Sequence, residues 1–142
     1  MKPFILTLAL AFLAIMPHTA KAMDMEHSAE KADVTAITFR SDSCGACKIL
    51  EPKIEKALDS LSNETKEKIN MVKFDFSNKQ AIEDTKELAQ SEGVNNILQE
   101  YGAKTGFVVL LNNHGEEVDM LKVDDSVEDI ASKLTKVIAS AS

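Results

Sequence analysis

Residues 40–52 read RSDSCGACKILEP and contain both cysteines of the chain, Cys44 and Cys47. Two residues separate the cysteines, and Pro52 follows five positions after the second. A disulfide that closes so short a loop removes little entropy from the unfolded chain, so a purely structural bridge accounts poorly for the pair. The spacing alone is equally compatible with a metal site and with a redox pair that exchanges thiols and disulfides.

The N-terminus predicts the compartment. A basic start precedes an apolar run at residues 4–16, and alanines stand at positions 20 and 22, the two that a signal peptidase reads. The apolar run is shorter than the ~20 residues of a spanning helix, which argues against an uncleaved anchor. We therefore expect residues 1–22 to be a signal peptide, export to the periplasm or another oxidising compartment, and no stable membrane insertion after cleavage.

The rest of the chain has the length of one small domain. Residues 23–33 (MDMEHSAEKAD) are polar and without periodicity, which predicts a flexible arm before a domain at 34–142. The formal net charge is −7, and removal of the leader with its two lysines makes it more negative. Such a charge argues against binding to nucleic acid or to an anionic lipid surface.

From Val34 onward, the hydrophobic periodicity alternates between that of strands and that of helices. The predicted elements are a strand at 34–39, a helix at 45–62, a strand at 69–76, a helix from 77 to 93, a short helix at 94–101, strands at 105–111 and 117–123 joined by a turn at 112–115, and a last helix from 125.

Local signals refine these boundaries. Ser77–Gln80 and Asp125–Glu128 resemble capping boxes and predict where two helices begin. Residues 105–111 form an unbroken apolar run, which predicts a central strand covered on both faces. In the helix after the cysteines, the apolar residues at helical spacing are expected to face the core; they are Ile49, Ile54, Ala57, Leu58 and Leu61.

The element order, with C-x-x-C opening the first helix, resembles the thioredoxin family over residues 34–139. The spacing from Cys44-Gly-Ala-Cys47 to Pro52, and the positions of Tyr101-Gly102 and Gly115-Glu116, also resemble that family. The resemblance implies an α/β thioredoxin fold: a central mixed four-stranded sheet flanked by helices, with an extra short helix before the third strand. It further implies a thiol–disulfide oxidoreductase that needs no cofactor and exchanges disulfides with protein thiols and a redox partner.

The chemistry of the pair can also be argued from its place at a helix start. A thiolate, not a thiol, attacks a disulfide. Free backbone N–H groups and the positive end of the helix dipole would favour the thiolate of Cys44. Cys47, one turn along, could then attack the mixed disulfide. We expect Cys44 to be the exposed nucleophile and Cys47 the more buried resolving thiol.

Three positions depart from the family pattern. Thioredoxins usually carry a buried acid where this chain has Thr38, and an aromatic residue where it has Ser43. The cis-proline that docks extended substrates is also missing. An equal-length alignment puts Phe107 there, and a shift of one or two residues puts Gly106 or Thr105 there. These three are the candidate substrate-binding residues, and we expect a trans peptide at this loop because a non-proline cis bond is costly.

Two of these assignments keep alternatives. Phe107 would either narrow the substrate groove or act as a core aromatic of the central strand. Arg40 lies on the same strand face as Thr38, four residues before Cys44, and could favour the thiolate while Asp42 opposes it. The other possibility is that Arg40 and Asp42 are solvated loop charges.

Two functions besides disulfide exchange remain as alternatives. The first is a delivery protein that binds copper or another metal through Cys44 and Cys47. A structural zinc needs four ligands, yet His27 belongs to the arm and His114 is expected in a turn roughly 20 Å away. We therefore expect no metal site. The second alternative is a non-catalytic thioredoxin-fold binding module, which would have little reason to keep both cysteines.

Overall fold

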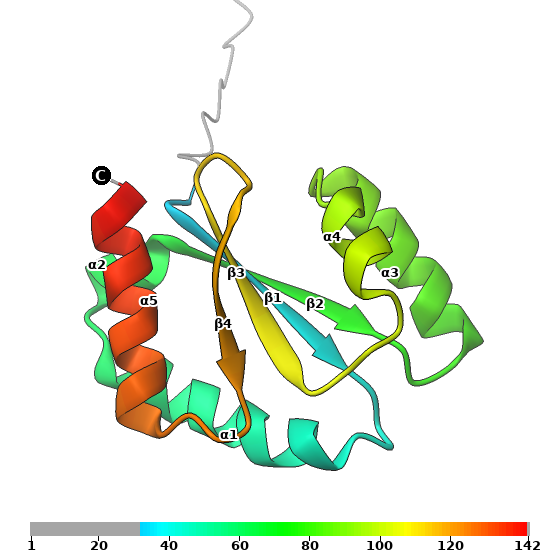
Figure 1. The fold of residues 1–142 in the computed structure, drawn as a ribbon, viewed down its shortest axis with the longest axis horizontal. Helices are drawn as coiled ribbons and strands as arrows, with labels where there is room; N and C mark the ends of the chain where they lie inside the picture. Colours follow the sequence, from blue (N-terminus) through cyan, green and yellow to red (C-terminus); the bar gives the residue numbers. More distant parts are fainter. Residues whose placement is uncertain (1–31, 142) are drawn as a thin grey trace, which may run out of the picture.

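The computed structural model describes residues 32–141, which form four strands and five helices (Figure 1). The predicted signal peptide and most of the predicted arm lie outside the described residues. The elements in chain order are β1 (Val34–Arg40), α1 (Gly45–Ser60), α2 (Asn63–Glu67), β2 (Ile69–Asp75), α3 (Lys79–Ser91), α4 (Asn95–Tyr101), β3 (Phe107–Asn112), β4 (Glu117–Lys122) and α5 (Val127–Ala141).

The four strands form one mixed sheet in the order β2-β1-β3-β4. β1 pairs with β2 in parallel, while β3 pairs with both β1 and β4 in antiparallel orientation. β1 and β3 are therefore the central strands, and both are almost entirely buried. This is the sheet that the family resemblance implied, and α4 is the extra short helix before the third strand, so the predicted fold is confirmed.

Helices cover both faces of the sheet (Figure 1). On one face, α1 and α5 pack over an aliphatic core that includes Leu50, Leu110 and Leu134. On the other face, α3 and α4 cover a core in which aromatic rings gather around Phe39 and Phe74. Alternate residues of β1 point into the two cores, as the two-residue period of a strand requires.

The buried face of α1 differs from the prediction at one position. The buried residues Cys47, Leu50, Ile54 and Ala57 follow helical spacing, but Ile49 is 54 % exposed. The stripe that begins at Cys47 therefore defines the inner face, and the expectation that Ile49 faces the core is wrong. α1 also ends at Ser60, and a separate short helix, α2, follows it where the sequence predicted none.

Both predicted capping boxes are displaced by one residue. Asn78, not Ser77, caps α3, because its side-chain oxygen accepts the Ala81 N–H at 3.0 Å. At α5, Ser126 accepts the Asp129 N–H, and the Asp129 carboxylate accepts the Ser126 N–H in return, both at 3.1 Å. This reciprocal pair is a capping box, but it begins one residue after the predicted Asp125.

The third strand begins two residues later than the apolar run at residues 105–111 predicted. β3 begins at Phe107, so Thr105 and Gly106 belong to the loop that precedes it. Gly106 has a φ of +100°, a backbone conformation that ends regular pairing and that glycine adopts without strain. Within residues 32–141, no helix is both long and apolar enough to cross a bilayer.

Candidate active site

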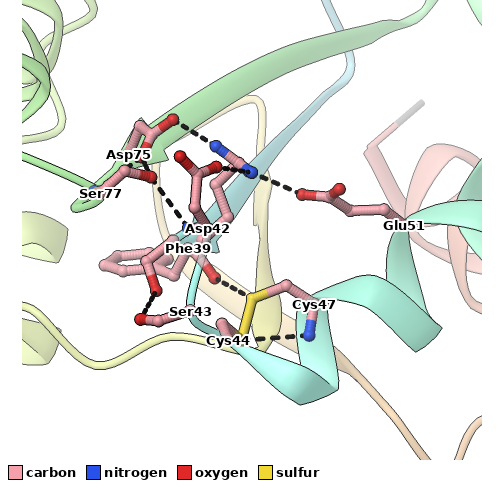
Figure 2. The surroundings of a disulfide bond; sticks show 10 residues. Phe39, Asp42, Ser43, Cys44, Cys47, Glu51, Asp75 and Ser77 are labelled. Atoms are coloured by element: carbon pink, nitrogen blue, oxygen red, sulfur yellow. Dashed lines mark hydrogen bonds and ion pairs between the residues drawn. A yellow bond between two sulfur atoms is a disulfide. The ribbon is translucent and has the colours of Figure 1, made fainter.

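The loop of residues 41–44 carries the chain from the end of β1 into α1 and places Cys44 at the helix N-cap. The Cys44 N–H donates to the Ser41 carbonyl at 3.1 Å, which fixes the turn. The Cys44 sulfur accepts the Cys47 N–H at 3.1 Å and so satisfies one of the free donors of the first helical turn (Figure 2). The sulfur therefore lies at the positive end of the α1 dipole.

Cys44 and Cys47 form a disulfide with a Cα–Cα distance of 5.3 Å (Figure 2). The two sulfurs differ in exposure. Cys47 is only 3 % exposed, and its sulfur lies 3.8 Å from the Phe39 carbonyl oxygen, whereas Cys44 is partly exposed. A partner molecule can therefore reach Cys44 more readily than Cys47.

On one side of the disulfide, the backbone of Gly106 lies against the pair. The Gly106 N–H donates to the Phe39 carbonyl at 2.8 Å, which holds the loop next to the end of β1. A Cβ added at Gly106 would lie 3.5 Å from the Cys44 sulfur and 2.9 Å from the Ala46 Cβ. Among the three candidate substrate-binding residues, Gly106 is thus the one whose backbone lies next to the Cys44 sulfur. The described residues contain no cis peptide bond, at this loop or elsewhere.

The other two candidates lie beside Gly106. Thr105 is half-buried in the loop. The Phe107 ring stacks on Phe39 with the ring centroids 4.9 Å apart and packs against Tyr101 at 5.2 Å. The Phe107 ring therefore packs against the aromatic core, as one of the two predicted alternatives stated. A part for Thr105, Gly106 or Phe107 in substrate binding stays a prediction.

At the end of β1, before the cysteine loop, Arg40 holds three carboxylates together. Its Nε donates to Glu51 at 2.9 Å, and its terminal nitrogens donate to Asp42 at 2.9 Å and to Asp75. The pKa of Arg40 is raised, chiefly by the hydrogen bond to Asp42, although partial burial acts to lower it. Arg40 is therefore neither a solvated loop charge nor a free cation beside the sulfur, because three carboxylates already compensate its charge.

Asp75 and Ser77 tie the cysteine loop to the end of β2. Burial raises the pKa of Asp75, but hydrogen bonds from Ser77 and Arg40 outweigh it and hold the pKa below its ordinary value. The Ser77 hydroxyl also accepts the Asp42 N–H at 2.9 Å. These contacts explain why Ser77 does not cap α3: its hydroxyl is engaged at the site instead.

Sequence reasoning missed Glu51, Asp75 and Ser77 at this site. The position of Glu51 could have been predicted, because it is four residues after Cys47 on a predicted helix and therefore lies on the same helix face. The position of Asp75 could not have been predicted from local sequence. Its approach to Arg40 depends on the parallel register of β1 and β2, in which Arg40 and Asp75 are partners.

A narrow hollow lies behind the disulfide on the α1 side of β1. Its walls include Thr38, Cys47, Leu50, Glu51 and Gly106. Thr38, in the place of the family's buried acid, is 7 % exposed. A hydroxyl does not ionise near neutral pH, so Thr38 cannot supply the charge that an acid would.

The described residues give no sign of a metal centre. Among residues 32–141, no three His, Cys, Asp or Glu side chains are placed to hold a metal ion. His114 is exposed in the turn between β3 and β4, as predicted, at the opposite end of β3 from Gly106. His27 lies outside the described residues.

The chain is similar to proteins of one known family. The family model described as Thioredoxin matches residues 15–96, which is more than half of the chain. No curated protein matches the chain significantly.

Solved structures similar to this chain include Trxlp from Edwardsiella tarda EIB202, at 18% identity and a TM-score of 0.49 over 75% of this chain and 86% of that one. Another is the Malassezia sympodialis thioredoxin Mala s 13, with 24% identity and a TM-score of 0.43 over 78% of this chain and 80% of that one. A third is StoA from Bacillus subtilis, with 18% identity and a TM-score of 0.49 over 74% of this chain and 84% of that one. The family match, together with the Cys44–Cys47 pair at the start of α1, makes this chain a member of the thioredoxin family and a thiol–disulfide oxidoreductase.

Proposed function

We propose that the protein is an exported oxidoreductase that exchanges disulfides with partner proteins through Cys44-Gly-Ala-Cys47. The observation that carries the assignment of roles is the unequal placement of the two sulfurs. Cys44 is partly exposed and accepts a backbone N–H at the start of α1, while Cys47 is 3 % exposed. An accessible sulfur at a positive helix end is suited to attack, and a buried one to resolution.

In the reducing direction, the Cys44 thiolate attacks one sulfur of a partner disulfide, and the other partner sulfur leaves as a thiolate. The Cys47 thiolate then attacks Cys44, which forms the Cys44–Cys47 disulfide and releases the second partner sulfur. The pair loses two electrons, and the partner gains them. The oxidising direction is the reverse sequence, and the reduction potential of the pair relative to its compartment sets which one prevails.

Export is the second part of the proposal and rests on the pattern of residues 1–22. Sequencing of the N-terminus of the protein isolated from its natural host should begin at Met23. A protein that retains Met1 would contradict export by this route.

The roles of the cysteines can be tested by trapping. Cys47→Ser should accumulate mixed disulfides with proteins from its own compartment, because attack is intact and resolution is absent. Cys44→Ser is the matched control and should trap far fewer. A brief pulse of iodoacetamide on the reduced protein should label Cys44 much faster than Cys47. Equal or inverted labelling would overturn the assignment.

The metal-delivery alternative predicts a different result. Purified reduced protein would then hold a stoichiometric metal ion through the two thiolates and reduce insulin poorly. Insulin reduction without bound metal supports the oxidoreductase, and the potential of the pair, measured by equilibration with glutathione, gives the direction.

A further inference from the structure

The resolving step requires that the Cys47 thiol lose its proton inside the protein. Cys47 is 3 % exposed, and the hollow behind it leaves no room for a water molecule. The proton therefore has no direct route to solvent on this side. A thiol is a poor nucleophile compared with its thiolate, so a protein group that accepts this proton would speed resolution.

Glu51 is the one carboxylate among the described residues that line this narrow hollow. It lies four residues after Cys47 on α1, where side chains share a helix face. Figure 2 shows both side chains extending from α1 in the same direction. The bond from Arg40 Nε to Glu51 Oε1, at 2.9 Å, holds the carboxylate in place through one of its two oxygens.

Glu51 also reaches water. A second, wider hollow of about 140 Å³ lies between α1 and the edge of the sheet, and Glu51 and Thr38 line both hollows. This wider hollow is large enough for water. The Glu51 side chain is 35 % exposed, so a proton taken up inside can pass from it to solvent.

We propose that Glu51 accepts the proton of Cys47 during resolution, an inference that rests on the proposed role of Cys47 as the resolving thiol. The S–H proton of Cys47 passes to a Glu51 carboxylate oxygen, and the thiolate attacks Cys44. The Cys44–Cys47 bond forms, the bond between Cys44 and the partner sulfur breaks, and the electron pair leaves on that sulfur. In the reverse direction, protonated Glu51 returns the proton to Cys47.

The other groups near Glu51 fit this role less well. Glu55 and Lys73 line only the wider hollow. Asp75 and Asp42 bind the same Arg40 guanidinium as Glu51 does, from β2 and the cysteine loop, but neither lines either hollow. Glu51 alone among these charged groups borders both Cys47 and the wider hollow.

The two chemical steps can be timed separately with dithiobisnitrobenzoate, which releases a coloured thiolate in each step. Attack by Cys44 gives a first phase whose rate is proportional to reagent concentration, and resolution by Cys47 gives a second phase that is independent of it. Glu51→Gln should slow the second phase by about ten-fold or more and leave the first within about two-fold. Its side-chain oxygen can still accept from Arg40, so the fold should be retained.

Glu55→Gln is the matched control, because it removes a carboxylate one turn further along α1; neither phase should change. Glu51→Ala should slow the second phase, and added acetate should restore it. An unchanged second phase in Glu51→Gln, or an equal slowing of both phases, would overturn the inference.

Cys47→Ser should release a single equivalent of coloured thiolate; release of none or of two would refute the proposed function, irrespective of Glu51.

Discussion

Two regions near the Cys44–Cys47 disulfide are built by different physical means. In the first, the backbone of Gly106 approaches α1 so closely that an added Cβ would lie 2.9 Å from the Ala46 Cβ and 3.5 Å from the Cys44 sulfur. In the second, Arg40 gathers three carboxylates by hydrogen bonds and charge. The first region depends on a close steric fit, and the second depends on a network of charged hydrogen bonds.

This difference indicates how each region should respond to mutation. A steric fit fails at once when one carbon is added, because packed protein has no spare volume. The charges are partly exposed, from 19 % at Arg40 to 78 % at Asp42, so water can replace part of each interaction. We therefore expect large effects at Gly106 and graded effects around Arg40.

The largest effect is expected for Gly106→Ala. The new Cβ meets Ala46, and the φ of +100° is strained for any residue with a Cβ. The expected loss of unfolding free energy is about 2–4 kcal/mol, measured by denaturant unfolding of the oxidised protein. Alkylation of Cys44 in the reduced variant should also slow, because the added carbon lies beside its sulfur.

Gly93→Ala provides the control for backbone strain alone. Gly93 also has a positive φ, +70°, but a Cβ there meets nothing within 4 Å. We expect a loss of about 1 kcal/mol and no change in alkylation of Cys44. If the two glycine variants lose equal stability, the close approach at Gly106 does not matter energetically.

Arg40→Gln is expected to have the next largest effect. It removes the cation and leaves the carboxylates of Glu51, Asp75 and Asp42 near one another without compensation. Stability at neutral pH should fall by about 1–2 kcal/mol. Added salt should recover part of the loss, because it screens the repulsion among exposed carboxylates. A loss that is independent of salt would indicate that packing of the Arg40 stem, rather than its charge, is what matters.

Acid should weaken the region around Arg40 through Asp75. Its pKa is lower in the folded protein than the ordinary value of about 3.9. The folded form therefore gains stability from Asp75 above about pH 4 and loses it as pH falls through the folded-state pKa. Asp75→Asn should be less stable than the wild type at neutral pH by about 1 kcal/mol, and the difference should shrink below about pH 4. A difference that is constant with pH would contradict the lowered pKa.

The smallest effect is expected for Asp42→Asn. The Asp42 side chain is 78 % exposed, and its N–H bond to Ser77 does not depend on the side chain. The change in unfolding free energy should stay below about 0.5 kcal/mol. Thermal melts of this variant beside Arg40→Gln would show whether the cluster depends on its central cation or on every partner equally.

Much of the fold could be predicted from local sequence. The strands, the helix after the cysteines and the turn at His114 followed from periodicity and turn chemistry, which act within a few residues. Some of the errors were also local in origin. Ile49 was assigned to the wrong side of α1, and the cap of α5 was displaced by one position, because neighbouring polar residues compete for the same backbone donors. The error at Ser77 was not local, because its hydroxyl accepts the N–H of Asp42, 35 residues away.

The sequence by itself determined that two cysteines stand at a helix start, since the strand, the turn and the first helical turn are adjacent in the chain. Only the tertiary structure decided what surrounds them. Asp75 reaches Arg40 across 35 residues because β1 and β2 pair in one parallel register. Gly106 reaches the Cys44 sulfur because β3 pairs beside β1. Such contacts depend on how strands are aligned across the sheet, which no short stretch of sequence encodes.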